Sequence, residues 1–313
     1  MTPRDENVPY KILCLDGGGA KGFYSLGVLR EIEAMAGKKL YELFDLVFGT
    51  STGSIISALI AQGFSVDDIH RQYKDHVPRI MQRKRASEKS KILAELADEV
   101  FGKAMFGDVK TAVGIVTTKW IIERPMIFKG SVSQAHGRVG TFVPGFGVSI
   151  SDAIQASCAA YPFFERKIVH TVAGDDVELV DGGYSANNPT LYAIADASRA
   201  MGIAHENIRV VSIGVGKYPT PKPAFLSKMW VAKYLESVQL LQKTFEINTQ
   251  SMDQLRAILF KDVPTVRISD TFEQPEMATD LFEHNLKKLN ILRQRGMESF
   301  APREMELKKL LLG

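Results

Sequence analysis

Short runs of apolar and β-branched residues alternate along the chain with longer segments of amphipathic helical spacing. The first run covers residues 10–15 and ends in a glycine-rich loop, after which apolar residues recur at the spacing of one helix face. A second run at 45–48 also ends in glycines and leads into an apolar helix at 55–61. This order of strand, glycine loop and helix is typical of βα units around a largely parallel sheet.

The same patterns predict the remaining elements. Four more strands are expected at 112–117, 125–128, 177–180 and 208–215, and two helices at 152–160 and 189–201. After a cluster of prolines at 219–223, long amphipathic stretches at 226–259 and 281–295 predict further helices. We therefore expect one domain over residues 1–313, with an α/β core at about 8–217 and a helical C-terminal extension at about 222–313.

Composition changes this picture little. The 313 residues are 45% hydrophobic and 24% charged, which is ordinary for a globular protein long enough to bury a core without disulfides or a metal. Cys14 and Cys158 stand among apolar neighbours, which predicts buried thiols. The N-terminal segment is charged where a signal peptide is apolar, and no apolar run approaches about 18 residues. We therefore expect a cytoplasmic protein without a membrane span.

Charge is balanced over the whole chain but not locally. The net charge of +3 argues against a dedicated binder of nucleic-acid polymers. Residues 71–91, however, carry eight cationic and two anionic side chains, a net charge of +6. The segment RIMQRKRASEKSK at 79–91 fits three interpretations: a solvated link between helices, a surface for anionic lipid headgroups, or a site for a phosphate-bearing activator.

The second glycine loop carries a candidate nucleophile. Gly49, Thr50, Ser51, Thr52 and Gly53 match the pattern G-x-S-x-G, in which two glycines allow a tight strand-to-helix turn that lifts the serine hydroxyl out of the sheet. The alternative is a plain turn in which the serine caps the helix. The apolar strand before the motif and the apolar helix after it favour the nucleophile.

The first glycine loop has two interpretations. Gly17, Gly19 and Gly22 fit the dinucleotide-binding pattern G-x-G-x-x-G, which would make the chain a nucleotide-dependent oxidoreductase. That pattern expects an acidic residue at the end of the next strand, where this chain has the serine loop. Alternatively, the amides of Gly17, Gly18 and Gly19 form an oxyanion hole for acyl transfer. Both loops would then meet at the carboxyl ends of adjacent parallel strands.

A nucleophilic serine also needs a base. Asp181 ends an apolar run and is followed by Gly182 and Gly183, which leave space beside it. An aspartate is ionised at neutral pH and accepts the serine proton directly if it lies within hydrogen-bond reach. The alternative is a simple Asp-Gly-Gly turn.

Histidines after Asp181 test whether a triad is the better interpretation. Only His205 and His284 follow it in the chain, and both have polar neighbours. A dyad of Ser51 and Asp181 is therefore the simpler hypothesis. A catalytically silent ligand-binding module is a third class that the residues leave open.

Taken together, the three loops resemble the patatin-like phospholipase family. The matching segments are DGGGAKG at 16–22, GTSTG at 49–53 and DGGYSANNP at 181–189. Weaker matches are SCAAYPFF at 157–164, SIGVG at 212–216 and DLFEHNLKKL at 280–289. Val215 replaces the threonine usual in the family. The resemblance implies a three-layer α/β/α fold with a mostly parallel central sheet, and hydrolysis of phospholipid acyl esters without a metal or other cofactor.

Carried over by position, the resemblance also implies roles for single residues. Ser51 is the expected nucleophile, Asp181 the expected base, and Gly17, Gly18 and Gly19 the expected oxyanion loop. Supporting roles fall to Lys21, Thr52, Gly49, Gly53, Gly182 and Gly183. Asn187 and Asn188 are expected to position the Asp181 loop and to cap the helix that begins at Pro189.

A narrower resemblance is to bacterial patatin-like effectors that a cyclic dinucleotide switches on during antiphage defence. Chain length, the segment GTSTGSII at 49–56 and the C-terminal extension fit this group. It implies a cyclic dinucleotide as activator, a phospholipid membrane as substrate and action at the inner membrane face. It is also compatible with a homo-oligomer. The segment FVPGFG at 142–147 fits either a lid at the lipid entrance or a buried connecting loop.

Overall fold

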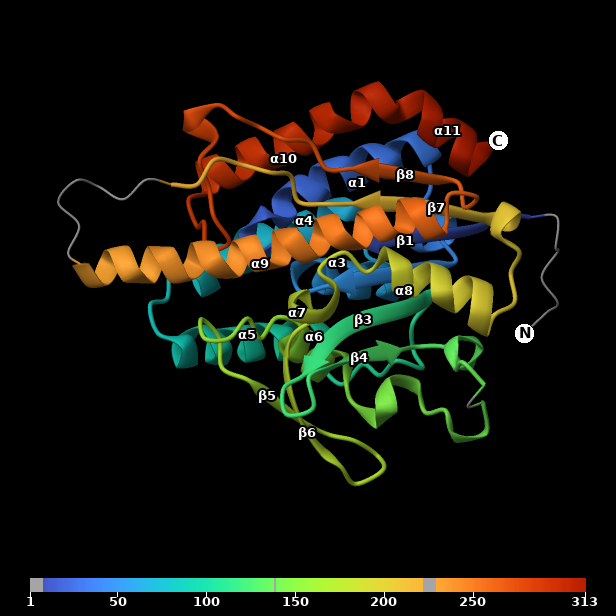
Figure 1. The fold of residues 1–313 in the computed structure, drawn as a ribbon, viewed down its shortest axis with the longest axis horizontal. Helices are drawn as coiled ribbons and strands as arrows, with labels where there is room; N and C mark the ends of the chain where they lie inside the picture. Colours follow the sequence, from blue (N-terminus) through green and yellow to red (C-terminus); the bar gives the residue numbers. More distant parts are fainter. Residues whose placement is uncertain (1–7, 138, 222–228) are drawn as a thin grey trace.

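An eight-stranded sheet forms the centre of the protein (Figure 1). The computed structural model describes residues 8–137, 139–221 and 229–313, so the charged N-terminal segment 1–7 and the expected start of a helix at 226–228 lie outside the described residues. The strand order is β5-β6-β3-β2-β1-β7-β8, with β4 paired to β3. The strands are β1 (Tyr10–Leu15), β2 (Leu46–Thr50), β3 (Ala112–Lys119), β4 (Arg124–Lys129), β5 (Lys167–His170), β6 (Asp176–Asp181), β7 (Ile208–Ile213) and β8 (Thr265–Ile268).

The central strands are buried on both faces, which explains their continuous apolar sequences. In β1, Ile12 and Cys14 face one hydrophobic core, while Leu13 and Leu15 face the other. Such strands belong to parallel sheets covered on both sides. The pairs β1–β2, β1–β7, β2–β3 and β7–β8 are parallel, whereas β3–β4, β3–β6 and β5–β6 are antiparallel. The expected mostly parallel sheet is therefore confirmed.

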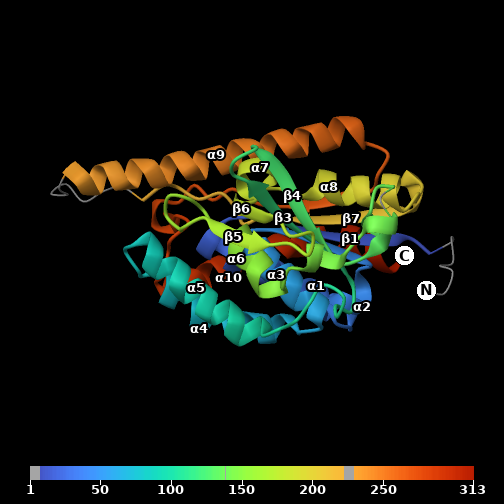
Figure 2. The same ribbon diagram turned by 90° about the horizontal axis from the view of Figure 1, so that it is seen from below.

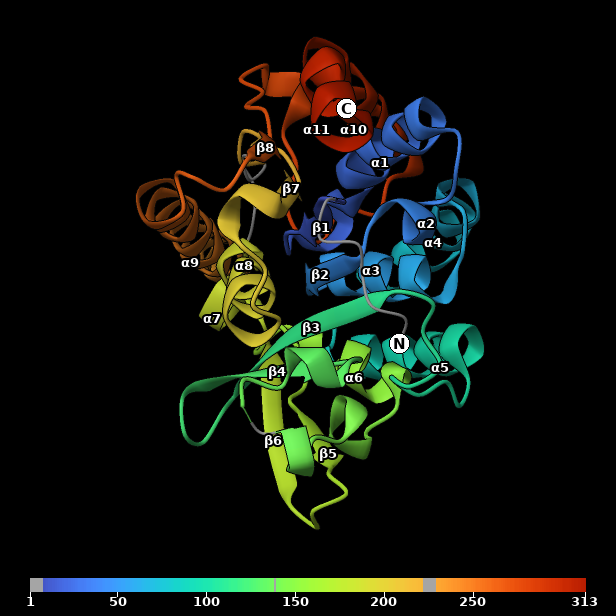
Figure 3. The same ribbon diagram turned by 90° about the vertical axis from the view of Figure 1, so that its right-hand side faces the viewer.

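Helices cover both faces and make three layers (Figure 3). One face carries α7 (Gly183–Ala186), α8 (Thr190–Ala195) and α9 (Met229–Leu259); the other carries α1 (Gly22–Ala36), α2 (Leu40–Leu43), α3 (Thr52–Gln62), α4 (Val66–Met81), α5 (Ala86–Phe101), α6 (Ile150–Ser157) and α10 (Leu286–Phe300), with α11 (Glu304–Leu312) after it. Figure 2 shows α9 along one side of the sheet and the pair α4–α5 along the opposite side. None of the described helices combines the length and hydropathy needed to cross a membrane.

Most of the expected elements are present, with shifted ends. All six expected strands form, although β7 ends at Ile213 and not at 215. The helix expected at 152–160 is α6, which ends at Ser157, and the helix expected at 189–201 is α8 followed by a π-helical turn at Asp196–Ala200. Strands β5 and β8 were not expected, and each has only four residues.

The C-terminal extension differs from the expectation in two ways. It contributes β8 to the sheet in addition to α9, α10 and α11. The expected helix at 281–295 is wrong for its first five residues, because α10 begins only after Asn285, whose side-chain oxygen accepts hydrogen bonds from the amides of Lys287 and Lys288. Residues 281–285 are instead part of a loop that reaches the candidate site.

The basic segment 79–91 forms the end of α4, a short turn and the start of α5, as expected of a link between helices. Arg83, Lys84 and Arg85 are exposed in and after the turn. Lys89 departs from the expectation of a solvated cation. Its side chain is 1% exposed, and its Nζ lies 4.6 Å from the centre of the Phe282 ring. The surface charge of this segment is therefore concentrated at the turn.

Candidate active site

Ser51 occupies a sharp turn between β2 and α3. Its backbone angles, φ 52° and ψ −123°, are strained for any residue other than glycine. The flanking glycines are required by close backbone contacts: a Cβ on Gly49 would lie 2.3 Å from the Gly53 carbonyl oxygen, and one on Gly53 would lie 2.3 Å from the Leu15 oxygen. The motif thus has the strand-turn-helix geometry of a nucleophile elbow.

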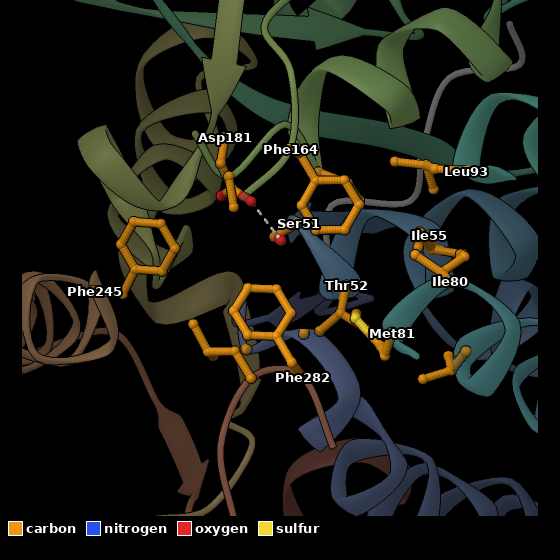
Figure 4. A pocket seen from close by; sticks show the side chains of 16 residues that line it. Ser51, Thr52, Ile55, Ile80, Met81, Leu93, Phe164, Asp181, Phe245 and Phe282 are labelled. Atoms are coloured by element: carbon orange, nitrogen blue, oxygen red, sulfur yellow. Dashed lines mark hydrogen bonds between the residues drawn. The ribbon is translucent and has the colours of Figure 1, made fainter. Parts of the chain in front are cut away.

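The Ser51 hydroxyl donates a hydrogen bond of 2.7 Å from Oγ to Asp181 Oδ2 (Figure 4). Strand β3 brings the two residues together, because it lies between the strands that carry them. Thr50, before the serine, pairs with Val116, whereas Asp181 pairs with the next residue of β3, Thr117. The carboxyl ends of β2 and β6 therefore meet across β3.

Asp181 is fully buried, and its second oxygen, Oδ1, accepts a hydrogen bond of 2.7 Å from the Gly183 amide. Burial raises the pKa of Asp181 to about 7, and the hydrogen bonds from Gly183 and Ser51 oppose this increase. A carboxylate with a pKa near neutrality is a better proton acceptor than an ordinary aspartate and is still largely ionised slightly above pH 7. The site can therefore remove a proton from the serine hydroxyl.

Ser157, at the end of α6, connects both halves of this pair. Its Oγ accepts a hydrogen bond of 2.9 Å from the Ser51 amide and donates one of 2.6 Å to the Val116 carbonyl. Two residues further on, the Ala159 carbonyl accepts a bond of 3.0 Å from the Asp181 amide. Sequence reasoning assigned no role to Ser157, although this residue begins the weak family segment at 157–164.

The glycine-rich loop after β1 lies beside the serine because β1 and β2 are parallel neighbours. The three expected oxyanion donors differ. The Gly17 amide donates to the Asn187 carbonyl at 3.0 Å, so it is already occupied. The amides of Gly18 and Gly19 have no acceptor among the described residues, and both glycines line the same pocket as Ser51. These two amides are placed to receive a developing negative charge.

Two asparagines hold the neighbouring segments in position, although Asn187 contacts the glycine loop where a contact with the Asp181 loop was expected, and α8 begins after Pro189 without a side-chain cap. The side-chain amide of Asn187 donates to the Gly17 carbonyl at 3.2 Å and to Thr249 Oγ1 at 2.8 Å, which ties the glycine loop to α9. Asn188 Oδ1 accepts a bond of 3.0 Å from the Thr190 amide, in the first turn of α8.

The supporting residues expected from the sequence occupy the immediate surroundings. Thr52 lines the pocket, and its Oγ1 lies 2.9 Å from the Tyr73 hydroxyl. The Gly182 amide donates to the Ser157 carbonyl at 3.4 Å. Lys21 is 4% exposed; burial lowers the pKa of its ammonium group, while the negative charges of Glu246 and Asp280 oppose this.

Arg267 is a site residue that sequence reasoning missed. Its guanidinium group forms a buried, two-bond ion pair with Asp16, the residue before the glycine loop, and donates a further bond of 2.8 Å to Ser212 Oγ. Burial raises the pKa of Asp16 to about 6, and the positive charge of Arg267 limits the increase. A single arginine in a four-residue strand gives no recognisable signal in the sequence.

The pocket above the serine is mainly apolar (Figure 4). Besides Ser51 and Asp181, it is lined by Gly18, Gly19, Thr52, Ile55, Val77, Ile80, Met81, Leu93, Cys158, Ala160, Phe164, Phe245, Leu281 and Phe282. Aliphatic and aromatic walls around one polar reacting pair suit an ester with a hydrocarbon chain. The thiols of Cys14 and Cys158 are free and buried, as the sequence predicted.

The segment 142–147 does not belong to this pocket. Phe142, Val143 and Phe146 line a separate cavity together with Met126 and Val172. The expectation of a lid at the lipid entrance is therefore wrong. A fully buried connection is wrong as well, because Phe146 is 41% exposed. Among the described residues, no group of three His, Cys, Asp or Glu side chains is placed to hold a metal ion.

Fold and site together define a class of protein: a hydrolase with a three-layer α/β/α fold, in which a serine on a strained turn has an aspartate as its hydrogen-bond partner. The family model "Patatin-like phospholipase" matches residues 13–194, and the chain belongs to this family. It is therefore a hydrolase of carboxylic esters, as predicted. The match includes the first glycine loop, which decides against the dinucleotide-binding alternative for that loop.

Similar proteins cover different shares of the chain. A cUMP-AMP-activated phospholipase from Escherichia coli is 66% identical over 302 residues, which are 96% of this chain and 94% of that protein. A cGAMP-activated phospholipase from Vibrio cholerae is 28% identical over 230 residues, 66% of this chain and 62% of that protein. The crystal structure of VipD from Legionella pneumophila superimposes with a TM-score of 0.50 at 15% identity, over 97% of this chain and 67% of VipD, which supports the fold.

Proposed function

We propose that the protein is a phospholipase of the A type in which Ser51 is the nucleophile and Asp181 the general base. The observation that carries this proposal is the hydrogen bond of 2.7 Å between the hydroxyl of a serine on a strained turn and a fully buried carboxylate. The apolar walls of the pocket supply the second requirement, a place for a fatty-acyl chain.

The proposed reaction has two steps. Ser51 Oγ attacks the ester carbonyl carbon while its proton passes to Asp181, and the amides of Gly18 and Gly19 bind the oxyanion. The intermediate collapses, the bond to the glycerol oxygen breaks, and that oxygen takes the proton from Asp181. Water then attacks the acyl-serine ester and gives a proton to Asp181, which returns it to Ser51 Oγ as the fatty acid leaves.

Substitution of the pair tests this assignment. We expect Ser51→Ala and Asp181→Asn to abolish fatty-acid release from phospholipid vesicles, and Ser51→Ala also to abolish labelling by a serine-directed fluorophosphonate. Ser57→Ala is the matched control, because Ser57 is a buried serine of α3, the helix that begins directly after Ser51, and it does not line the pocket. The assignment is wrong if Ser51→Ala retains hydrolysis at the rate of the control.

We also propose that a cyclic dinucleotide switches the enzyme on, with cUMP-AMP as the first candidate. The support is the 66% identity, over nearly the whole length of both chains, to a cUMP-AMP-activated phospholipase. A nearly buried serine fits a gated enzyme: Ser51 is only 8% exposed, and the stacked rings of Phe164 and Phe282 line the pocket beside it. Vesicle hydrolysis with cUMP-AMP, cGAMP or neither tests the proposal, and equal rates in all three contradict it.

In cells, this gated activity would act in antiphage defence. We expect cells that carry the wild-type gene together with a source of the activating dinucleotide to reduce phage plating. Cells that carry Ser51→Ala should plate phage like cells without the gene. Equal protection by both alleles would show that a role in defence does not depend on hydrolysis, which contradicts the proposal.

We further propose that the protein acts peripherally at the inner membrane face. The basic turn with Arg83, Lys84 and Arg85 directly follows Ile80 and Met81, which line the pocket, so anionic headgroups bound at the turn would bring lipid to the site. Each cation near such a surface contributes on the order of 1 kcal/mol. Replacing all three by glutamine should weaken binding to anionic vesicles by about a hundredfold, with neutral vesicles as the control.

A homo-oligomer is the last part of this proposal. Long helix α9 presents the apolar side chains Leu240, Ile247 and Ile258 to solvent, each more than 60% exposed. A second copy would cover them. Light scattering with and without cUMP-AMP tests this, and a monomer under both conditions contradicts it.

A further inference from the structure

We propose that a second apolar cavity, enclosed by α3, α4, α5 and α6, receives the distal half of the substrate's acyl chain and sets the preferred chain length. This inference rests on the proposed function of Ser51. It adds to that function a binding site for a long saturated or unsaturated hydrocarbon chain. It also names the residues that determine specificity for the length of that chain.

The cavity is lined almost entirely by hydrocarbon. Its walls are Ile55, Leu59, Tyr73, Val77, Ile80, Leu93, Leu96, Ala97, Val100, Phe101 and Ile154, with Gln72 and His76 as its polar members. Most of the apolar lining residues are less than 10% exposed. An apolar cavity of this kind binds apolar ligands in preference to water.

The cavity continues the pocket of the serine. Both spaces share the same four lining residues, Ile55, Val77, Ile80 and Leu93, so only aliphatic side chains separate them. Figure 4 shows three of these, Ile55, Ile80 and Leu93, grouped on one side of Ser51. A chain whose carbonyl is fixed at the serine therefore meets the second cavity when it extends toward α4 and α5.

The separating side chains must rotate before a chain can pass. The free space is about 60 Å³ in the serine pocket and about 50 Å³ in the second cavity, enough for a few water molecules each but too little for a long acyl chain. Isoleucine and leucine side chains change rotamer without leaving the core. Entry of the chain therefore requires these shared side chains to change rotamer.

The length of the channel follows from helix geometry. From Met81, at the serine pocket, to Gln72, at the far end of the second cavity, α4 covers nine residues, or about 14 Å at about 1.5 Å per residue. An extended chain advances about 1.2 Å per bond, so this distance corresponds to about 12 bonds. The channel therefore fits long chains and leaves a six-carbon chain inside the first pocket.

A polar pair marks the end of the channel. His76 Nε2 lies 2.6 Å from Gln72 Oε1, and His76 Nδ1 is buried without a hydrogen-bond partner among the described residues. Further methylene groups would meet these polar atoms without offering the hydrogen bond that Nδ1 lacks, so a longer chain gains no favourable contact there. The pair thus limits how far a chain extends.

Filling the second cavity tests the inference. Ala97 lines it from α5, so Ala97→Phe should block the distal part of the chain, and Val100→Phe, a half-buried position in the same lining, is a second variant should the first fail to fold. Ala94→Phe is the matched control, because Ala94 lies one turn away on the same helix and lines neither space. The substrates are p-nitrophenyl hexanoate and palmitate, with cUMP-AMP present.

Each excluded methylene reduces binding about fourfold. We therefore expect the ratio of kcat/KM for palmitate to that for hexanoate to fall at least tenfold in both filled variants and to stay unchanged in the control. An unchanged ratio in folded, active Ala97→Phe and Val100→Phe overturns the inference, as does the same fall in Ala94→Phe.

A labelling experiment separates failure of the channel from failure of the proposed function. Ethyl and hexadecyl fluorophosphonates react with the same serine but differ in chain length. If Ser51 is the nucleophile and the channel exists, Ala97→Phe slows labelling by the hexadecyl reagent only. Equal slowing of both reagents, or none, contradicts the channel, whereas no labelling of the wild-type protein by either reagent contradicts the role of Ser51.

Discussion

Replacing Asp181 by asparagine should remove activity and at the same time stabilise the fold at alkaline pH. The substitution keeps the shape of the side chain and both of its hydrogen bonds: the amide oxygen can accept from the Gly183 amide, and the amide nitrogen can donate to Ser51 Oγ. It removes the buried charge. The structural cost of that charge in the wild-type protein therefore becomes measurable.

The magnitude follows from the pKa of Asp181, which burial raises from 3.8 to about 7. Between these values the folded protein holds a proton that the unfolded chain has released, so the stability contributed by this group is present at low pH and is lost as pH rises toward 7. One pH unit corresponds to about 1.4 kcal/mol. From pH 5 to pH 7 the wild-type protein thus loses about 3 kcal/mol that the asparagine variant, which does not titrate, retains.

Urea unfolding of both proteins at pH 5 and pH 8 measures this difference. We expect Asp181→Asn to be more stable than the wild-type protein at both pH values, because the unfolded aspartate is already ionised at pH 5, and we expect this advantage to be about 3 kcal/mol larger at pH 8. If the difference in free energy of unfolding between the variant and the wild-type protein is the same at both pH values, the reasoning is refuted. Fatty-acid release, measured on the same samples, should be lost at both.

The remaining predictions concern rate, stability and reactivity. With a pKa of about 7 for Asp181, kcat should rise about tenfold between pH 6 and pH 8 as the base ionises, and a flat profile contradicts this. Arg267→Met should cost about 3 kcal/mol in urea unfolding because it leaves the buried Asp16 carboxylate unpaired, and adding Asp16→Asn should recover part of the loss; an additive double variant argues against the pair. Gly18→Ala would place a methyl group 2.5 Å from a neighbouring valine side chain and shift the oxyanion amide, so kcat should fall about a hundredfold with little change in KM. Cys158, whose pKa burial raises, should resist iodoacetamide at pH 8, and rapid alkylation of the folded protein would show an open pocket.

Local motifs were predictable where a turn requires a particular residue type. The turn at Ser51 requires its flanking glycines, and the turn after Asp181 is marked by two glycines. Both signals lie within a few neighbouring residues, so the sequence alone indicates each turn and its candidate chemistry. The apolar runs identify the central strands for the same reason, because a strand buried on both faces, such as β1, has few polar positions.

Contacts between distant segments were not predictable in the same way. Ser51 and Asp181 come into contact because β3 pairs with β2 on one side and with β6 on the other. No local sequence pattern predicts the register of either pairing. Arg267 lies in a strand of four residues, too short for a hydrophobic period to be recognised. Its partner Asp16 is 251 positions away. Ser157 acts through its side chain on two backbone groups, which no spacing rule reveals.

The contacts between the first glycine loop and the last fifth of the chain have a consequence for biosynthesis. Asp16 pairs with Arg267, and the Ala20 amide donates to the Leu281 carbonyl at 2.9 Å, so the oxyanion loop is held by residues that are synthesised long after it. A nascent chain that already exposes Ser51 and Asp181 lacks these contacts and keeps the Asp16 carboxylate without its partner. The oxyanion loop therefore gains its full set of contacts only after translation has passed residue 281.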